Sequence, residues 1–256
     1  MLKLLRQWRD RRLIRRHPIE SAAWSETLAA LPVLQHLSVS ESHRLRDLTA
    51  LFLRRKTFML VQGLELTPPQ KLLIAAQACL PILNLDFGWY DDWLTVIVYP
   101  GKFLRPRREM DASGVMHEWV EVLRGEAWRR GPVVLSWADV AGSGMGDGYN
   151  VIIHELAHQL DMLNGGADGF PPLHDSMRAS EWNRAFTEAY AELNAAIDHD
   201  METPIDTYAG ESPAECFAVF SEYFFEWPFL VHRHYPRVYD QLRAFYRQDP
   251  LRRLAA

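Results

Sequence analysis

The chain of 256 residues is 48% hydrophobic and 12% aromatic, which is enough to bury a sizeable core in one large domain or two small ones. Its net charge of -5 and its pI near 6.1 argue against direct binding of nucleic acid, because phosphate binding depends on a concentrated positive surface. Its two cysteines, Cys79 and Cys216, form no C-x-x-C pair and no disulfide framework, so we expect a reducing compartment.

Residues 1–17 mix basic and apolar side chains in one amphipathic segment. No apolar stretch of signal-peptide length follows, and no run in the chain is long enough to span a bilayer, so we predict a cytoplasmic protein. The commoner arrangement for such a segment is a terminal helix with a solvated basic face. The alternative is contact with an anionic membrane surface or an acidic partner. The basic residues are Lys3, Arg6, Arg9, Arg11, Arg12, Arg15 and Arg16.

Residues 19–85 have the character of a helical scaffold. Ser38-Val-Ser-Glu41 and Thr67-Pro-Pro-Gln70 are capping-box patterns, and apolar residues at helical spacing follow each. Between them, residues 56–62 fit either a short strand or the end of a helix.

After Pro81 the pattern changes to strands. Residues 93–99 are β-branched and aromatic and stop at a Pro-Gly pair, and residues 132–137 form a second such run. Residues 116–128 alternate between apolar and polar side chains and fit a further strand or one arm of a hairpin. The Arg105-Pro-Arg-Arg108 cluster is expected to be a solvated turn.

Residues 142–148 carry a glycine at every second position. This is not a phosphate-binding loop, because G-x-x-x-x-G-K-[ST] is absent. We interpret it as a loop that leads from the strand at 132–137 into the next helix. If that strand is an edge strand, it could hold an extended peptide by backbone pairing.

The next helix, residues 151–161, contains His154, Glu155 and His158 in the pattern H-E-x-x-H. Residues four apart lie on one helical face, so both imidazoles can reach one Zn²⁺ ion. Glu155 is then placed to take a proton from a water molecule at the site. Asn150 is expected to cap this helix, and Asn164-Gly-Gly is expected to stop it.

The C-terminal part predicts a helix over residues 180–198 and another that begins at the capping pattern Ser212-Pro-Ala-Glu215. From Trp227 onward we expect the chain to pack around the outside. The third metal ligand comes from this part or from the end of the H-E-x-x-H helix. The candidates are Asp161, His174, His199, Glu215 and Glu222.

Glu215 is the strongest of these candidates, because it opens an apolar helix that must pack on the core. The extended metzincin pattern is excluded, since Asp161 and Asn164 stand where it needs glycine and histidine. We expect Asp161 to accept a hydrogen bond from a ligand imidazole instead. His174 and His199 are expected to be surface residues.

His-Glu-Leu-Ala-His at 154–158, followed by Tyr208 and Pro213-Ala-Glu-Cys-Phe-Ala218, resembles the Mlc titration factor A family of bacterial zinc metallopeptidases. The resemblance runs along most of the chain. The site is also similar to that of anthrax lethal factor, a gluzincin-like peptidase. The resemblance implies three zinc ligands (His154, His158 and Glu215), Glu155 as general base and Tyr208 as a hydroxyl donor to the developing oxyanion.

The resemblance further implies an aminopeptidase acting on short peptides and a protein that binds Mlc, the glucose repressor. We therefore expect an α+β, zincin-like metallopeptidase, mostly helical with a small sheet beside the H-E-x-x-H helix. It would form one domain over residues 1–256, with a helical part over about 1–85. The alternative is a repressor-sequestering protein whose peptidase activity is secondary or absent. A structural zinc site is disfavoured, because closed sites use four ligands and only three are evident.

Overall fold

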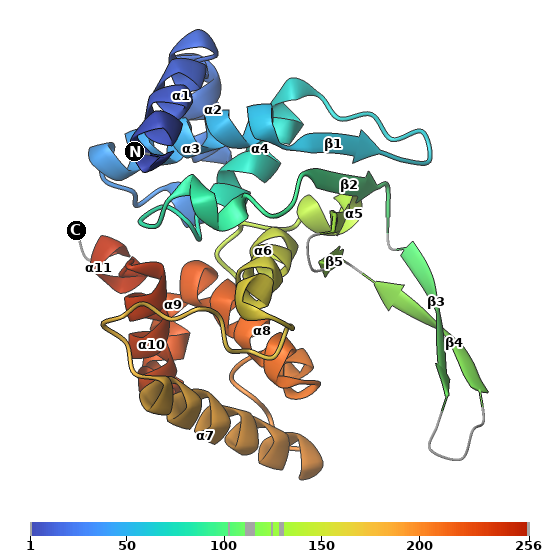
Figure 1. Cartoon of the computed structure of the whole chain (residues 1–256). Helices are drawn as coiled ribbons and strands as arrows, with labels where there is room; N and C mark the ends of the chain where they lie inside the picture. Colours follow the sequence, from blue (N-terminus) through green and yellow to red (C-terminus); the bar gives the residue numbers. More distant parts are fainter. Residues whose placement is uncertain (1, 102, 111–115, 124, 128–130, 255–256) are drawn as a thin grey trace.

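The computed structural model describes residues 2–101, 103–110, 116–123, 125–127 and 131–254, and helices form most of this part (Figure 1). Both predicted capping boxes are present: Ser38 accepts a hydrogen bond from the Glu41 N–H, and Thr67 accepts one from the Gln70 N–H. The helices of the first half are α1 (Leu2–Arg16), α2 (Ser21–Ala30), α3 (Val39–Arg55) and α4 (Pro68–Cys79), with 3-10 turns at Pro32–Leu34 and Phe87–Tyr90.

A four-stranded sheet lies beside these helices, in the order β1-β2-β6-β5. β1 (Thr57–Leu60), β2 (Thr95–Tyr99) and β6 (Val133–Ser136) are parallel, and β5 (Gly125–Ala127) runs antiparallel to β6. Residues 56–62 are thus mainly a strand. The strand at 132–137 does not meet the condition for peptide pairing, because β6 is not an edge strand: β2 pairs with one side of it and β5 with the other.

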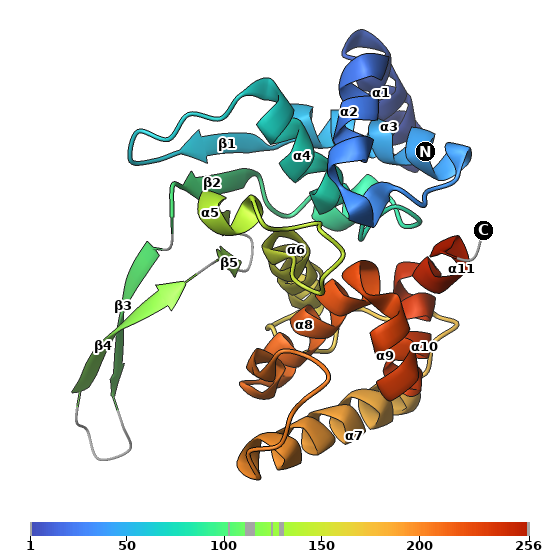
Figure 2. The ribbon, with the colours of Figure 1, turned by 180° about the vertical axis from the view of Figure 1, so that it is seen from behind.

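β3 (Phe103–Met110) and β4 (Met116–Leu123) form a separate antiparallel ribbon that projects from the body of the molecule (Figures 1 and 2). The strand predicted within residues 116–128 is confirmed. The solvated turn predicted at Arg105–Arg108 was wrong, because these residues lie within β3. In the register of this ribbon, Arg105 stands opposite Glu121 and Arg108 stands opposite Glu118.

Helices form most of the second half of the chain. All residues of α6 (Val151–Asp161) are buried, and this helix packs against α4, α8 and the strands β5 and β6. α10 has five buried apolar side chains at helical spacing and exposed residues on its other face, which agrees with the expectation that the chain after Trp227 packs around the outside of the core. The remaining helices are α5 (Trp137–Val140), α7 (Ala179–Asp198), α8 (Pro213–Glu226), α9 (Pro228–His234), α10 (Pro236–Tyr246) and α11 (Pro250–Leu254).

One continuous cluster of buried hydrophobic side chains runs from Trp24 to Tyr246. α6 contacts β5 and β6 on one side and α8 on another, so the candidate metal ligands are held between the sheet and the C-terminal helices. This is an α+β arrangement. None of the described helices is long and apolar enough to cross a membrane.

Candidate metal centre

The first residues of α6 are fixed by the cap that precedes them. The Asn150 side chain accepts a hydrogen bond from the Ile153 N–H at 3.0 Å, as the sequence predicted. The loop before it turns at Gly144, Gly146 and Gly148, which all have positive φ. At Gly148 a Cβ atom would lie 2.6 Å from the Tyr223 ring, so this close approach requires glycine.

Three predicted ligands meet where α6 and α8 cross. The Nε2 atoms of His154 and His158 are 3.2 Å apart, and Glu215 Oε2 lies 2.9 Å from the first and 3.2 Å from the second. Ligand atoms at about 2.0–2.1 Å from one tetrahedral zinc ion are separated by roughly 3.3 Å, which agrees with these spacings. The cluster therefore fits a metal ion of this size.

Glu215 reaches the histidines from the first turn of α8. Ser212 caps this helix by accepting a hydrogen bond from the Glu215 N–H at 3.2 Å. The other half of the predicted capping box is not formed, because the Glu215 carboxylate points to the two imidazoles instead. The backbone of Glu215 is thus held by the cap while its side chain is available to the site.

Glu222 supports His154 from the opposite side of the imidazole. Its Oε1 lies 2.8 Å from His154 Nδ1, and its Oε2 accepts a hydrogen bond from the Asn150 N–H at 2.6 Å. A carboxylate on Nδ1 orients the ring so that Nε2 faces a metal. The sequence suggested Glu222 only as a possible ligand, and the structure gives it this orienting position.

The expectation that Asp161 accepts a hydrogen bond from a ligand imidazole was wrong. Asp161 Oδ2 accepts from the Gly169 N–H at 2.8 Å and so fixes the loop that follows α6. His174 is half-buried and bonds through Nε2 to the Phe245 carbonyl at 2.8 Å, so it is not the surface residue that we expected. His199 is exposed at the end of α7, as predicted.

Glu155 and Tyr208 border the same cluster. Glu155 is only 3% exposed, and its Oε2 atom has no hydrogen-bond partner among the described residues. Burial raises the pKa of Glu155 to about 8, although the neighbouring His154 opposes this effect. The Tyr208 ring centre lies 5.9 Å from that of His154, and Tyr208 is 43% exposed, so its side chain stands at the open side of the site.

The charges of the cluster compensate one another. Burial alone would lower the pKa of His154, but the hydrogen bonds to Glu215 and Glu222 raise it well above its usual range. Burial would likewise raise the pKa of Glu215, and the hydrogen bonds from both histidines hold it far below its usual range. Burial lowers the pKa of His158, which favours the neutral, metal-binding imidazole.

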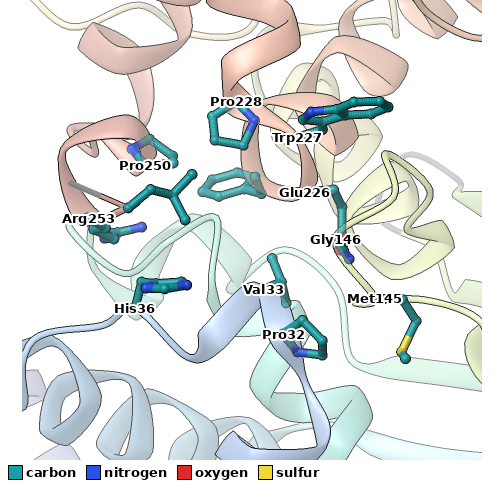
Figure 3. A pocket seen from close by; sticks show the side chains of 12 residues that line it. Pro32, Val33, His36, Met145, Gly146, Glu226, Trp227, Pro228, Pro250 and Arg253 are labelled. Carbon is teal, nitrogen blue, oxygen red and sulfur yellow. Dashed lines mark hydrogen bonds between the residues drawn. The ribbon is translucent and has the colours of Figure 1, made fainter. Parts of the chain in front are cut away.

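The polar network continues behind α6 to Glu226. Its carboxylate accepts hydrogen bonds from the Gly146 N–H and from the Asn150 side chain, both at 2.6 Å. Glu226 also lines a separate pocket of about 350 Å³ between the glycine loop, the end of α8 and α11 (Figure 3). Sequence reasoning missed Glu226. The available signal was its spacing, because Glu215, Glu222 and Glu226 share one face of an apolar helix.

Comparison with known proteins places the chain in a family. A family model described as glucose-regulated metallo-peptidase M90 matches residues 5–247. The chain belongs to the M90 metallopeptidase family. Its relatives include proteins called Mlc titration factor A. That of Klebsiella pneumoniae subsp. pneumoniae is 40% identical over 232 residues, which cover 90% of this chain and 87% of the relative. That of Yersinia pestis is 40% identical over 237 residues, which cover 91% and 87%.

The resemblance to the Mlc titration factor A family is therefore confirmed. Membership of the M90 family implies a metal ion, and His154, His158 and Glu215 form a cluster that could bind one.

Proposed function

We propose that this M90 protein is a zinc-dependent peptidase with a zincin-like, gluzincin-type site. The observation that carries the proposal is the convergence of His154, His158 and Glu215 from two helices, with the buried carboxylate of Glu155 adjacent to the first ligand. Zinc suits two imidazoles and one carboxylate, and it leaves a fourth position open.

When bound, Zn²⁺ would supply a Lewis acid that polarises the scissile carbonyl and makes water acidic near neutral pH. Glu155 accepts a proton from the attacking water and later passes it to the leaving amine. Tyr208 donates its hydroxyl to the oxyanion of the tetrahedral intermediate, which contributes a few kcal/mol of stabilisation. Glu222 keeps the His154 ring in its ligating orientation.

We further propose that β5, and not β6, pairs with an extended peptide substrate. β5 is the last strand in the sheet order and contacts α6. Its outer edge can add a strand through backbone hydrogen bonds. The substrates we propose are short peptides with a free amino terminus.

A second function is favoured by the relatives. Because they are named for titration of Mlc, we propose that this chain also binds an Mlc-like transcriptional repressor in the cytoplasm and so influences control of sugar uptake. Repressor capture could also be the principal function, with peptidase activity secondary.

The test is hydrolysis of unblocked and N-blocked short peptides by the zinc-loaded protein and by Glu155→Gln. We expect the wild type to cleave unblocked peptides and the variant to bind zinc equally but lose turnover by about 100-fold or more. Parallel loss of zinc and activity would show that Glu155 is structural.

Repressor binding is tested separately, by capture of an Mlc-like repressor with the wild type and with Glu155→Gln. If neither protein cleaves peptides while zinc is bound, and Glu155→Gln still captures the repressor, repressor binding is the principal function. If the repressor is not captured by either protein, the second proposal is wrong.

A further inference from the structure

The outward face of α1 is strongly cationic. Successive residues of an α-helix are about 100° apart, so six exposed positions of α1 fall within an arc of about 160°. Five of the six side chains are arginines and none is acidic. Among the residues of α1 whose exposure the structure describes, residues 6 and 8–16, the six exposed ones are Trp8, Arg9, Arg11, Arg12, Arg15 and Arg16.

The opposite face of α1 is held by the body of the protein. Arg6 forms an ion pair with Asp91 at 2.6 Å, and Asp10 is paired with Arg55. Leu13 and Ile14 pack against the hydrophobic core. The single acidic residue of the helix is therefore turned inward and neutralised, while the arginines point outward.

The outward arginines have no carboxylate partner within the described part of the chain. Arg15 donates to the Arg11 carbonyl, and the Arg12 guanidinium lies 5.4 Å from the centre of the Trp8 ring. These contacts are internal to the helix and leave its positive charge uncompensated. Trp8 is 53% exposed, so much of its apolar indole surface is in contact with water.

Charge is also divided unevenly across the molecule. α1 has seven basic residues and one acidic residue, so the rest of a chain with a net charge of -5 carries a net charge of -11. Figures 1 and 2 place α1 at the edge of the molecule, on the opposite side from α7. An anionic plane would therefore attract α1 and repel the remainder, which orients the protein with this helix toward the plane.

We propose that the outward face of α1 binds the surface of an anionic lipid bilayer. A flat bilayer can contact all six side chains at once, and a helix of this length lies about 22 Å along the surface. The arginines pair with lipid phosphates, and Trp8 enters the layer between headgroups and acyl chains, where indole rings are favoured. A nucleic-acid duplex offers no such apolar layer to Trp8, and the acidic remainder of the protein would be repelled by its phosphates.

Co-sedimentation with vesicles tests the proposal. The full-length protein is mixed with vesicles of phosphatidylcholine alone or containing about one-third phosphatidylglycerol, an anionic lipid. We expect binding to the anionic vesicles that is lost at high salt, and little binding to the neutral ones. The triple variant Arg12→Gln/Arg15→Gln/Arg16→Gln should bind roughly 100-fold more weakly, and Trp8→Ala roughly threefold to tenfold more weakly.

The matched control removes the same charge elsewhere. Arg178, Arg184 and Arg233 are also exposed, and their replacement by Gln should weaken vesicle binding by less than about threefold. Equal loss in both triple variants would overturn the proposal, since net charge alone would explain it. Equal binding to neutral vesicles, or binding to duplex DNA or an acidic peptide without binding to vesicles, would also overturn it. The inference is independent of peptidase activity, which should be unchanged in the α1 variants.

Discussion

Glu222 is a buried carboxylate that orients a candidate metal ligand and is not itself one of the three ligands. Its Oε1 lies 2.8 Å from His154 Nδ1, and its Oε2 accepts the Asn150 N–H, so it holds a ligand and the cap of α6 together. Glu222→Ala should lower zinc affinity by about 10–100-fold, because the imidazole loses its orienting partner. Competition with a chromophoric chelator measures this change.

The control for this prediction is Glu192→Ala, which removes an exposed carboxylate from α7 and should leave zinc affinity unchanged. Glu222→Gln should recover part of the affinity, since its amide oxygen can still accept from Nδ1. Unchanged zinc affinity in Glu222→Ala would mean that the packing of α6 alone orients His154.

We expect Glu226 to make the free energy of unfolding depend on pH. Burial raises its pKa to about 7, and the hydrogen bonds from Asn150 and Gly146 oppose this only in part. The unfolded chain releases this proton near the ordinary glutamate pKa, whereas the folded protein keeps it until about pH 7. The folded state therefore binds more protons between these values, and the group's contribution to stability falls as pH rises through this window.

Urea unfolding of the metal-free wild type and Glu226→Gln at several pH values isolates this effect. Gln cannot titrate, so the free energy of unfolding of the wild type, relative to the variant, should decrease by up to about 3 kcal/mol between pH 5 and pH 8. A difference that is constant with pH would show that Glu226 is already ionised at pH 5.

At the scale of elements, the loop after α6 is built around Gly169. Its N–H donates to Asp161 and its carbonyl accepts from the Trp182 indole, so it connects α6 with α7. Its φ is +76°, and a Cβ atom there would lie 2.3 Å from the carbonyl oxygen of Pro213, the first residue of α8. Gly169→Ala should destabilise the protein by at least about 2 kcal/mol. It should also weaken zinc binding, because Glu215 lies in the displaced turn.

Gly166 provides the matched control, because a Cβ atom there meets nothing within 4 Å. Gly166→Ala should change the free energy of unfolding by less than about 0.5 kcal/mol. Thermal unfolding and zinc titration of both variants check the pair. Similar values for the two alanine variants would show that the loop can move away from α8 at little cost.

The elements most clearly anticipated by the sequence are those specified locally. Ser38, Thr67 and Asn150 act as the predicted caps, because a short polar side chain before an apolar helix has a local partner in the next turn. The convergence of His154 and His158 follows directly from helical periodicity. The family resemblance indicated Glu215 and Tyr208, which the structure brings to the same cluster.

The errors concern partners that lie outside the local motif from which each expectation was drawn. Asp161 had the spacing of an imidazole partner. Its carboxylate instead accepts a hydrogen bond from the Gly169 N–H in the loop that follows α6. The position of β6 inside the sheet depends on pairing with β5, which no local pattern reveals. Arg105 and Arg108 lie in a strand that pairs with β4, whose facing residues are ten or more positions further along the chain. In each case a contact outside the motif overrode the local preference.

At the scale of the whole molecule, the metal centre joins parts of the chain that are more than fifty residues apart. His154 and His158 come from α6, Glu215 comes from α8, and both helices lie in the common core. A metal ion bound there stabilises the folded protein, because the unfolded chain has no preformed site. Zinc at about 100 times its dissociation constant adds roughly 2.7 kcal/mol to the free energy of unfolding. For a chain of this size, the melting temperature should rise by about 5–10 °C.

Thermal unfolding in a chelator and after addition of zinc measures this rise. His154→Ala should abolish the rise, because the two ligands that remain, His158 and Glu215, cannot hold the ion in place. His199→Ala removes an exposed histidine that lies outside the cluster, and it should keep the full rise. If both variants keep the rise, zinc stabilises the protein at another site. If the wild type shows no rise, the three side chains do not bind zinc, and the compensating charges of His154 and Glu215 would be a structural ion pair.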